Sequence, residues 1–558
     1  MLETEILDGL IAGMQSSPER AQSILEEVVS IPELLASEEV FESTTRQREN
    51  GIFYTNFRLA RIMIAEAFEQ SKNRAGSFFE PCVGGGAFYF AFIDQSMKAT
   101  GGKESDLQKI LDRCYIADND AIALATLKRV APIYFKAQYG HELDIPESNI
   151  FLGDSLWSSE ESSIQNFRKI FNEPKGFDFV ITNPPYKMIK GDKRQGKTST
   201  NSLIETISQI RTSKSLKFIQ GVPNLYKLFV EAITCHWVSE KGTVGLLIPK
   251  SLLSDSQSSD LREHLLENFE LGSIFGIPEG SEHFKGVGQA FSMFVAAKGA
   301  STSSVVFADI PNSEEMLIVR SEPLDIGIIR KYSTKSALHR VSGDGQKLLT
   351  HLADFPTVGS FPGAVNLRGE FDMTLDIGFL SESDTGLSLI QGINLGHYST
   401  NPSRKFVDSS FLNRPKGKWI KQHRIACQQI SNMNQVRRMK WSLIQPGSVL
   451  GNSCNFVGIE SDGLWAVPEE SIFYFLGILN SSLINERFKL LSPNNHVSNG
   501  EINSLPIGDL NTPEVGEIIK LSQKLSREFH GKLFEELDTL VLKHFGLAEK
   551  DRYWEATK

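Results

Sequence analysis

The sequence is poor in cysteine and has no long apolar run. Its five cysteines, Cys82, Cys114, Cys235, Cys427 and Cys454, are scattered and none are spaced as CxxC. This spacing argues against a zinc site or a disulfide framework and favours a reducing cytoplasm. No stretch approaches the roughly 18 apolar residues that a membrane-spanning helix needs, and the first residues lack the basic and apolar regions of a signal peptide. We therefore expect a cytoplasmic protein without a membrane partner.

Acidic residues outnumber basic ones, which at first argues against nucleic acid as a partner. The 558-residue chain has a formal net charge of −10. The basic residues are clustered, however, because residues 404–440 hold ten Lys and Arg against Asp408 alone, and residues 187–197 hold five against Asp192 alone. Binding depends on where charge lies, so both segments are candidates for contact with phosphates.

The pattern of apolar residues changes three times along the chain. Residues 1–45 predict amphipathic helices. From 46 to 325, short apolar strands alternate with helical stretches, which is typical of a Rossmann-like α/β domain with a mostly parallel sheet and helices on both faces. Residues 326–511 are irregular, basic and rich in Gly, Ser, Asn and Pro, and they predict a mixed α+β domain. Residues 512–558 are again helical in pattern.

A glycine-rich turn follows the first predicted strand, at Glu80-Pro81-Cys82-Val83-Gly84-Gly85-Gly86. Glycines after a strand let the backbone approach a ligand closely, although such turns also close ordinary strand–helix junctions. The spacing does not match the dinucleotide pattern GxGxxG, because Gly86 is followed by Ala87-Phe88-Tyr89.

Acidic residues end the next two predicted strands. Asp118-Asn119-Asp120 follows one, and Gly153-Asp154-Ser155 follows the other. Asp118 is suited to binding ribose hydroxyls, and Asp154 could accept a hydrogen bond from an adenine amino group. Each acid could instead cap a helix. Two such acids after a glycine-rich turn nevertheless meet at the carboxyl edge of a sheet, where open α/β sheets bind ligands.

Asn183-Pro184-Pro185-Tyr186 follows the fourth predicted strand and is the most specific motif in the chain. Two prolines stiffen the loop, so the Asn183 side-chain carbonyl and the Pro184 backbone carbonyl can accept both hydrogens of one aromatic amine. These dipoles would stabilise the nitrogen as it attacks a methyl group and gains positive character. Tyr186 offers a flat face for a base taken out of the duplex.

These motifs together resemble the gamma-class adenine-N6 DNA methyltransferases related to the TaqI and Eco57I enzymes, over about residues 46–300. The resemblance implies S-adenosyl-L-methionine as the cofactor. Gly51-Ile52-Phe53-Tyr54-Thr55 is similar to the family motif that covers the methionine end of that cofactor, with Asn56 in place of a proline. The positions that the resemblance assigns to the cofactor are Tyr54, Thr55, Glu80, Pro81, Gly84, Gly86, Asp118, Asn119, Asp154 and Ser155.

The resemblance also implies a second aromatic residue that holds the flipped base opposite Tyr186. Candidates are Phe284, Phe291 and Phe294, and we favour Phe284 or Phe291. Lys187 and Lys190 begin the basic segment after the catalytic motif, which is either a solvated loop or a contact with phosphates near that base.

The basic segment 404–440 is the candidate for reading DNA. Lys418, Lys421, Arg424, Arg437 and Arg438 lie among amides and tryptophans. Arg and Lys can read guanine, while Asn and Gln can read adenine, although a solvated basic face would have the same composition. Residues 390–394 and 473–482 further resemble parts of the specificity domain in the same family.

The leading interpretation is the modification component of a restriction–modification system, or a solitary methylase, that acts on duplex DNA. A separate restriction endonuclease would then be a partner, because about 45 residues before the catalytic domain are too few for a nuclease domain. A monomer is favoured, and the oligomeric state stays open. Alternatives are a protein-glutamine methyltransferase, which uses the same Asn-Pro-Pro-Tyr loop but is typically small, and a noncatalytic DNA-recognition subunit. No simple code gives the recognition sequence.

Overall fold

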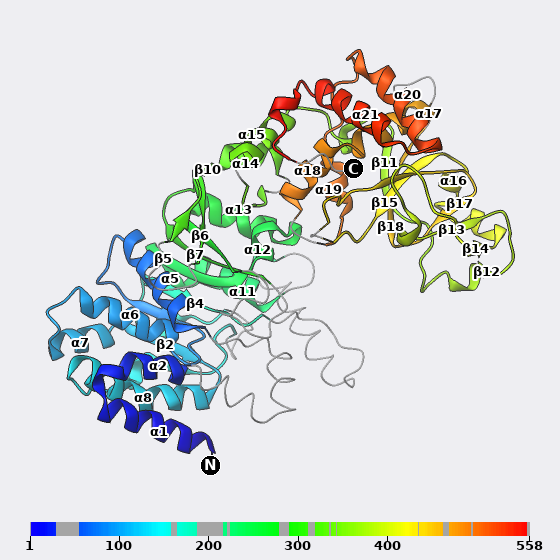
Figure 1. Ribbon diagram of the computed structural model, residues 1–558. Helices are drawn as coiled ribbons and strands as arrows, with labels where there is room; N and C mark the ends of the chain where they lie inside the picture. The colour runs from blue at the N-terminus through cyan, green and yellow to red at the C-terminus, as the bar shows by residue number, and fades with distance from the viewer. Residues whose placement is uncertain are drawn as a thin grey trace. The chain divides into compact units, whose positions relative to one another are not determined.

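Strands from Phe78 to Asp325 form a ten-stranded sheet in the N-terminal half of the computed structural model (Figure 1). The structure describes residues 2–29, 55–157, 164–186, 216–219, 224–277, 290–310, 318–333, 336–341, 343–432, 435–460, 468–492 and 495–554. The chain divides into two compact units, the first comprising Met1–Ile329 with Lys335–Ala337, and the second Arg330–Thr334 with Leu338–Lys558.

The large sheet has the order β10-β8-β6-β7-β5-β4-β1-β2-β3, with β9 paired to β8. Strands β3, β2, β1, β4 and β5 run parallel, while β7 is antiparallel to both β5 and β6. The chain order therefore reverses between β1 and β4, and such a switch point is where open α/β sheets bind ligands. The strands are β1 Phe78–Glu80, β2 Cys114–Asp118, β3 Ile150–Leu152, β4 Phe177–Thr182, β5 Val238–Pro249, β6 Phe269–Ile277, β7 Phe291–Lys298, β8 Ser304–Asp309, β9 Val319–Arg320 and β10 Leu324–Asp325.

Both faces of this sheet are buried, which explains why its central strands read as continuous apolar runs. Phe78 stacks on Phe92 of α6 with ring centroids 4.4 Å apart. Phe79, its neighbour, contacts Phe167 and Trp237 on the opposite face. The helices of this unit are α1 Leu2–Ser16, α2 Ala21–Val29, α5 Phe57–Gln70, α6 Ala87–Lys98, α7 Glu104–Leu111, α8 Ala121–Tyr139, α9 Phe167–Ile170, α11 Leu225–Ala232, α12 Ser251–Ser254, α13 Ser259–Asn268 and α14 Ile326–Tyr332, which runs into the second unit.

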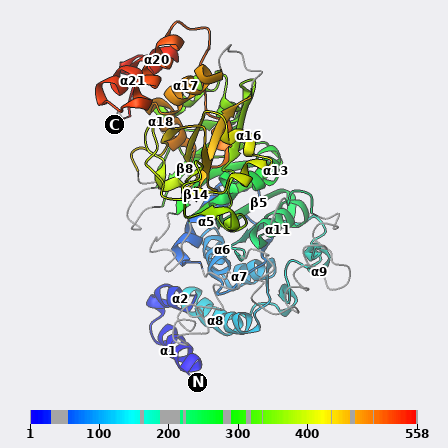
Figure 2. The ribbon, with the colours of Figure 1, turned by 90° about the vertical axis from the view of Figure 1, so that its right-hand side faces the viewer.

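The second unit combines two four-stranded sheets, β11-β18-β15-β16 and β12-β14-β13-β17, with a helical layer. Helix α17 packs on β15, β16 and β18. Helix α20 packs on α17 and α21 (Figure 2). The strands are β11 Ala364–Arg368, β12 Leu380–Ser381, β13 Ser388–Ile390, β14 Phe406–Val407, β15 Arg424–Gln428, β16 Trp441–Ile444, β17 Ser448–Leu450 and β18 Cys454–Ile459. The helices are α15 Gly343–Leu352, α16 Gly417–Ile420, α17 Pro468–Leu479, α18 Ser482–Leu491, α19 Asn499–Asn503, α20 Glu514–Arg527 and α21 Gly531–His544.

The predicted fold class is confirmed, with a Rossmann-like α/β unit followed by a mixed α+β unit. Residues 512–554 pack into the core of the second unit, and α1 and α2 pack on α8 in the first. Among the described residues, no helix is long and apolar enough to cross a bilayer.

Candidate active site

Three strand ends bring the sequence-predicted residues to one edge of the large sheet. Strands β2, β1 and β4 are parallel neighbours, and they end at Asp118, Glu80 and Thr182. Asn183 follows Thr182 directly. The glycine-rich turn, the acid of the second strand and the Asn-Pro-Pro-Tyr motif therefore lie side by side at the switch point of the sheet.

The glycine-rich turn is hydrogen-bonded to the side chain of Asp118. The Gly84 N–H donates to Oδ2 of Asp118 over 2.8 Å, and the Asp120 N–H donates to Oδ1 over 2.9 Å. Gly86 caps α6 with a φ of 83°, and a Cβ there would lie 2.3 Å from Cδ1 of Leu127. Only glycine satisfies both the left-handed backbone and this close approach.

Glu80 is a buried carboxylate whose Oε2 has no hydrogen-bond partner within the described part of the chain. Burial raises its pKa well above the ordinary value, and the nearby charge of Asp118 raises it further. Thr182, at the end of β4, is also buried, and its side chain contacts the thiol of Cys82. Buried polar atoms are normally hydrogen-bonded, and leaving one unpaired costs about 1–3 kcal/mol. This edge therefore offers acceptors for a ligand that brings a donor or a positive charge.

Cys82 lies among these groups. Burial, followed by the charges of Asp118 and Glu80, raises the pKa of its thiol well above the ordinary value, and the charge of Asp154 also contributes. The carboxylates of Glu80, Asp118 and Asp154 thus all affect the Cys82 thiol. The described residues contain no group of three His, Cys, Asp or Glu side chains arranged to hold a metal ion.

The other predicted cofactor residues have more local roles. Asp154 is exposed, and its Oδ1 accepts from the N–H of Leu156 at 2.8 Å and of Trp157 at 3.1 Å. These two bonds form an Asx turn and do not cap a helix, because the described residues that follow, Ser155–Trp157, are not helical. Ser155 and Pro81 are buried, while Asn119 is exposed. Tyr54 lies outside the described residues, as do Lys187, Lys190 and Phe284.

Asn183 and Tyr186 form a small network with two partners. The Asn183 Nδ2 donates to Oγ1 of Thr55 over 3.1 Å. The Tyr186 hydroxyl donates to Leu247 O over 2.8 Å and also contacts Oδ1 of Asn183. Thr55, predicted to lie over a cofactor, therefore contacts the side chain of the catalytic motif. Pro184 is buried and Pro185 half-buried.

The ring of Tyr186 is supported by two other aromatic residues. Its centroid lies 5.0 Å from that of Phe291 at an interplanar angle of 35°, and 6.3 Å from that of Tyr226 at 77°. A base between two rings needs roughly 7 Å, twice the usual carbon contact distance. Phe291, 1% exposed at the start of β7, therefore braces Tyr186 and does not face it across a base. Burial raises the pKa of the Tyr186 phenol well above its ordinary value.

The predicted DNA-reading residues divide into exposed and buried sets. Lys418 and Lys421 are exposed, and Lys418 pairs with Glu460 at 2.7 Å. Arg424 is fully buried in an ion pair with Glu370 at 2.9 Å and donates to Ser448 O at 2.7 Å.

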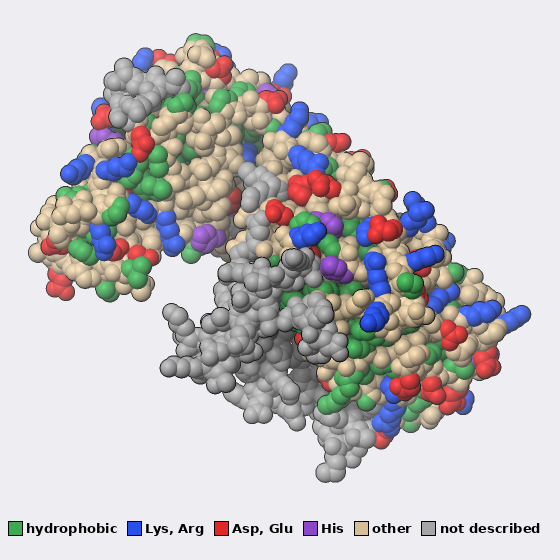
Figure 3. Space-filling model, turned by 180° about the vertical axis from the view of Figure 1, so that it is seen from behind, with side chains coloured by type: hydrophobic (Ala, Val, Ile, Leu, Met, Phe, Trp, Pro, Cys, Tyr) green, Lys and Arg blue, Asp and Glu red, His purple; other side chains and the backbone are tan. Residues whose placement is uncertain are grey.

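Arg437 and Arg438, each 6% exposed, also bond inside the second unit. Arg437 donates to Asn480 O and Arg438 to Ser492 O. The expectation that Arg424, Arg437 and Arg438 contact DNA is therefore corrected, since all three residues are buried and their guanidiniums bond to groups within the second unit. On the face seen in Figure 3, exposed Lys and Arg are interspersed with acidic side chains.

Sequence reasoning missed Thr182, Tyr226 and the carbonyl of Leu247. Thr182 directly precedes the motif, so its position at the strand end was a usable signal. A backbone carbonyl leaves no trace in a residue pattern, and the contact between Thr55 and Asn183 spans 128 residues.

Comparison with known proteins agrees with this geometry. Residues 112–284 match the family model described as Eco57I restriction-modification methylase. The chain is similar to the type II methyltransferase M.BsuBI of Bacillus subtilis, with 24% identity over 241 residues, which are 42% of this chain and 41% of that protein. The match thus spans less than half the length of that relative.

Two solved structures share the fold over most of the chain. One is the DrdV–DNA complex, with a TM-score of 0.55 and 12% identity, covering 91% of this chain and 60% of the other. The second is the type IIL restriction-modification enzyme MmeI in complex with DNA, with a TM-score of 0.53 and 12% identity, covering 90% and 77%. At these identities the likeness concerns the fold alone. The similarity to the Eco57I restriction-modification methylase family therefore lies in the domain at residues 112–284.

Proposed function

We propose that this protein transfers a methyl group from S-adenosyl-L-methionine to the N6 amino group of adenine in duplex DNA. The observation that carries the proposal is the adjacency of Asn183 at the end of β4 to the acidic strand ends Glu80 and Asp118. As the modification component of a restriction–modification system, the protein would work in the cytoplasm beside a separate restriction endonuclease. The second unit would then be its target-recognition domain.

The strand-end residues fit this cofactor. The unpartnered Oε2 of Glu80 suits the ammonium group of the methionine part. Asp118 accepts two backbone hydrogen bonds, and its oxygens keep lone pairs for ribose hydroxyls. Gly86, which has no side chain, lets the turn keep its left-handed backbone and pack closely against Leu127. When bound, the cofactor supplies an electrophilic methyl group.

Asn183 and Pro184 would orient the adenine amine. Two carbonyl acceptors hold its two hydrogens, so the nitrogen lone pair points away from them toward the methyl carbon. As the N–C bond forms and the bond between the methyl carbon and sulfur breaks, the nitrogen becomes positive and these dipoles stabilise it, until one of its protons leaves for solvent. Oδ1 of Asn183 contacts the Tyr186 hydroxyl in this structure. Substrate binding would therefore replace this contact and leave the hydroxyl donating to Leu247 O alone.

Tyr186 would hold the flipped base on its ring. Removing a base from the duplex costs a few kcal/mol. Stacking of the base on a ring that is already held in place offsets part of this cost. Phe291 and Tyr226 contact this ring, and Leu247 O accepts a hydrogen bond from its hydroxyl. Incubation of duplex DNA with the protein and methyl-labelled cofactor tests the proposal, with N6-methyladenine as the expected nucleoside. Label found in protein or on cytosine would contradict it.

Asn183→Ala should reduce methyl transfer at least 100-fold, because one of two carbonyl dipoles at the reacting nitrogen is lost and such groups contribute about 10²–10³. Cofactor affinity, measured by calorimetry, should stay within about threefold. Asn511→Ala, the same change at an exposed site in the second unit, is the control and should leave both unchanged. Equal losses of transfer and cofactor affinity would assign Asn183 to cofactor binding instead.

A further inference from the structure

The connection between β15 and β16 is held by two buried asparagines of the α17–α18 region. Asn485 Oδ1 accepts from the N–H of Arg438 at 2.8 Å and of Met439 at 3.1 Å, and its Nδ2 donates to Val436 O at 3.0 Å. Asn480 exchanges two bonds of 2.9 Å with the backbone of Trp441. Both asparagines are at most 1% exposed. The backbone that leads into β16 is therefore held by hydrogen bonds at Val436, Arg438, Met439 and Trp441.

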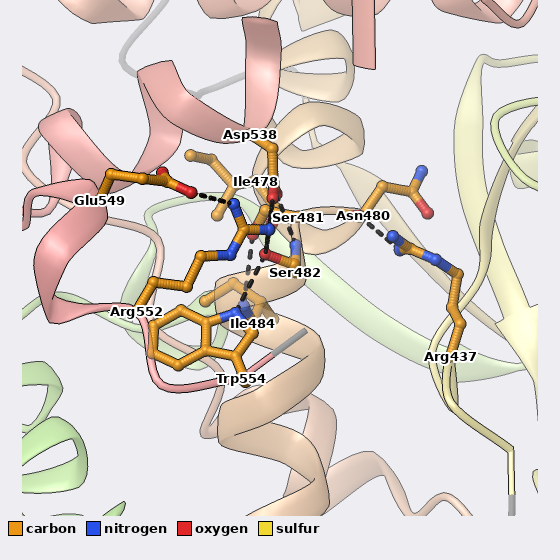
Figure 4. A network of polar contacts seen from close by, with 10 residues as sticks. All are labelled: Arg437, Ile478, Asn480, Ser481, Ser482, Ile484, Asp538, Glu549, Arg552 and Trp554. Atoms are coloured by element: carbon orange, nitrogen blue, oxygen red, sulfur yellow. Dashed lines mark hydrogen bonds and ion pairs between the residues drawn. The ribbon is translucent and has the colours of Figure 1, made fainter. Parts of the chain in front are cut away.

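Two buried guanidiniums reinforce this segment. Arg437 donates to Asn480 O over 2.6 Å and lies 5.0 Å from the centroid of Phe534 (Figure 4). Arg438 donates to Ser492 O and lies 4.9 Å from the centroid of Phe488. Burial lowers the pKa of both side chains. Burying a cation costs free energy of desolvation. Two buried guanidiniums in this connection therefore indicate that its conformation is important.

The other arm of the same connection is also paired. The Gln429 N–H donates to Ser453 O at 2.9 Å, and the Val497 N–H donates to Gln429 O at 2.8 Å. The two arms are joined where Ser431 Oγ donates to Arg438 O at 2.7 Å. A helical turn lies beside them, because Gly392 N–H donates to Ser453 Oγ at 2.9 Å and Gln428 Nε2 donates to Gly392 O at 2.7 Å.

This rigid frame presents exposed side chains at one end of the sheet β11-β18-β15-β16. Ile393 is 84% exposed and Ile430 is 66% exposed, each one residue from a group bonded to Ser453. Exposed His496 pairs with Ile430 in a backbone bridge. Exposed Arg368, at the end of β11, donates to Gln429 Oε1 at 3.1 Å and Asn452 O at 2.8 Å. We call Arg368, Ile393, Ile430 and His496 the loop-end surface.

We propose that the loop-end surface reads base edges in the major groove, with Ile393 and Ile430 contacting thymine methyl groups. This rests on the proposed function, and it gives the second unit a defined reading edge in place of the buried arginines. An isoleucine side chain that is exposed to water gains no free energy of burial. The major groove displays the thymine methyl group, which is an apolar surface that such a side chain can contact. Arg368 and His496 add donors for base edges or phosphates. Rigid support is what discrimination between bases requires.

The test uses the full chain and a pool of duplexes with a randomised centre. The sequence selected by binding should contain thymines whose replacement by uracil weakens wild-type binding about fourfold each, as expected for the loss of one buried methyl group. The double variant Ile393→Ala with Ile430→Ala should bind the selected sequence about tenfold less tightly and be indifferent to uracil. Leu375→Ala with Ile377→Ala is the matched control, because these residues are 81% and 60% exposed elsewhere in the second unit.

Each result supports or overturns the inference. It is overturned if the double variant, with an unchanged melting temperature, keeps wild-type affinity and sequence preference, or if no uracil substitution matters. It is also overturned if the variant loses only self-association in sedimentation, which would make the surface a contact between copies of the chain. Selection does not require catalysis. A protein that selects a sequence but methylates nothing would refute the proposed function and leave this inference standing.

Discussion

Basic residues that are neighbours in the sequence have opposite roles in the second unit. Lys421 is exposed, while Arg424, three positions on, has a side chain that is 0% exposed. A guanidinium has five donors in a fixed plane, so backbone carbonyls and one carboxylate can satisfy it in the interior. Arg424 bonds Glu370, Trp419 O and Ser448 O in this way. A count of basic residues therefore overestimated the surface available to DNA.

Glu370→Gln should destabilise the second unit by about 3–5 kcal/mol, because it leaves the Arg424 cation buried without its counter-charge. Glu370 also accepts from the Leu450 N–H at 2.7 Å. Denaturant titration of the full chain measures the effect. Replacing both partners, with Glu370→Leu and Arg424→Met, should cost less than the single change. Lys418→Ala, which breaks the exposed pair with Glu460, is the control, and an equal loss from it would refute the argument.

At the scale of elements, the α17–α18 turn joins three distant segments. Asp538 of α21 accepts from the N–H and hydroxyl of Ser482, at 2.7 and 2.6 Å. Arg552 donates to Asp538 Oδ2 at 2.7 Å, and Trp554 Nε1 donates to Ser482 Oγ at 3.1 Å (Figure 4). Two residues before Ser482, Asn480 holds Trp441 and Arg437. The C-terminal segment thus stabilises the turn that supports the loop-end surface.

Ending the chain after Asp551 should lower the stability of the second unit, because Asp538 is 2% exposed and would lose its cationic partner. We expect a loss of about 3 kcal/mol or more, together with weaker selection of DNA sequence. Ending it after Trp554 is the control, since this keeps Arg552 and Trp554. Thermal melting and duplex binding measure the two effects. Indistinguishable behaviour of both truncations would show that these contacts do not stabilise the turn.

At the scale of the whole molecule, each unit has its own hydrophobic core. One is built around the large sheet, and the other between the helices α17, α18, α20 and α21 and the sheet β11-β18-β15-β16. Separate cores imply separate cooperative transitions.

Calorimetry should therefore resolve two unfolding transitions that respond to different substitutions. Gly86→Ala, which forces a Cβ against Leu127, should lower one of them, and Glu370→Gln should lower the other. Glu66→Gln, which removes the charge opposite the partly exposed Arg320 in the first unit, is the control and should shift neither strongly. A single transition moved equally by Gly86→Ala and Glu370→Gln would mean that the two cores unfold as one.

Much of the first unit could be predicted from the sequence. Apolar strands that end at Glu80, at Asp118 and directly before Asn183 form where the pattern indicates, because each depends on residues close in the chain. The second unit was predictable only in class. Its short strands β12, β13 and β14 are set by pairing with distant segments, and this pairing has no local signal.

The sequence by itself determined the chemistry of the strand ends and the order in which they occur, since a glycine-rich turn, an acid and Asn-Pro-Pro-Tyr are local features. Only the tertiary structure decided which neighbours these residues have. It placed Thr55 on Asn183, braced Tyr186 with Phe291, and buried Arg437 and Arg438 as supports for a loop. The physical reason is that burial and long-range hydrogen bonds depend on packing between segments far apart in the chain, which residue types alone do not specify.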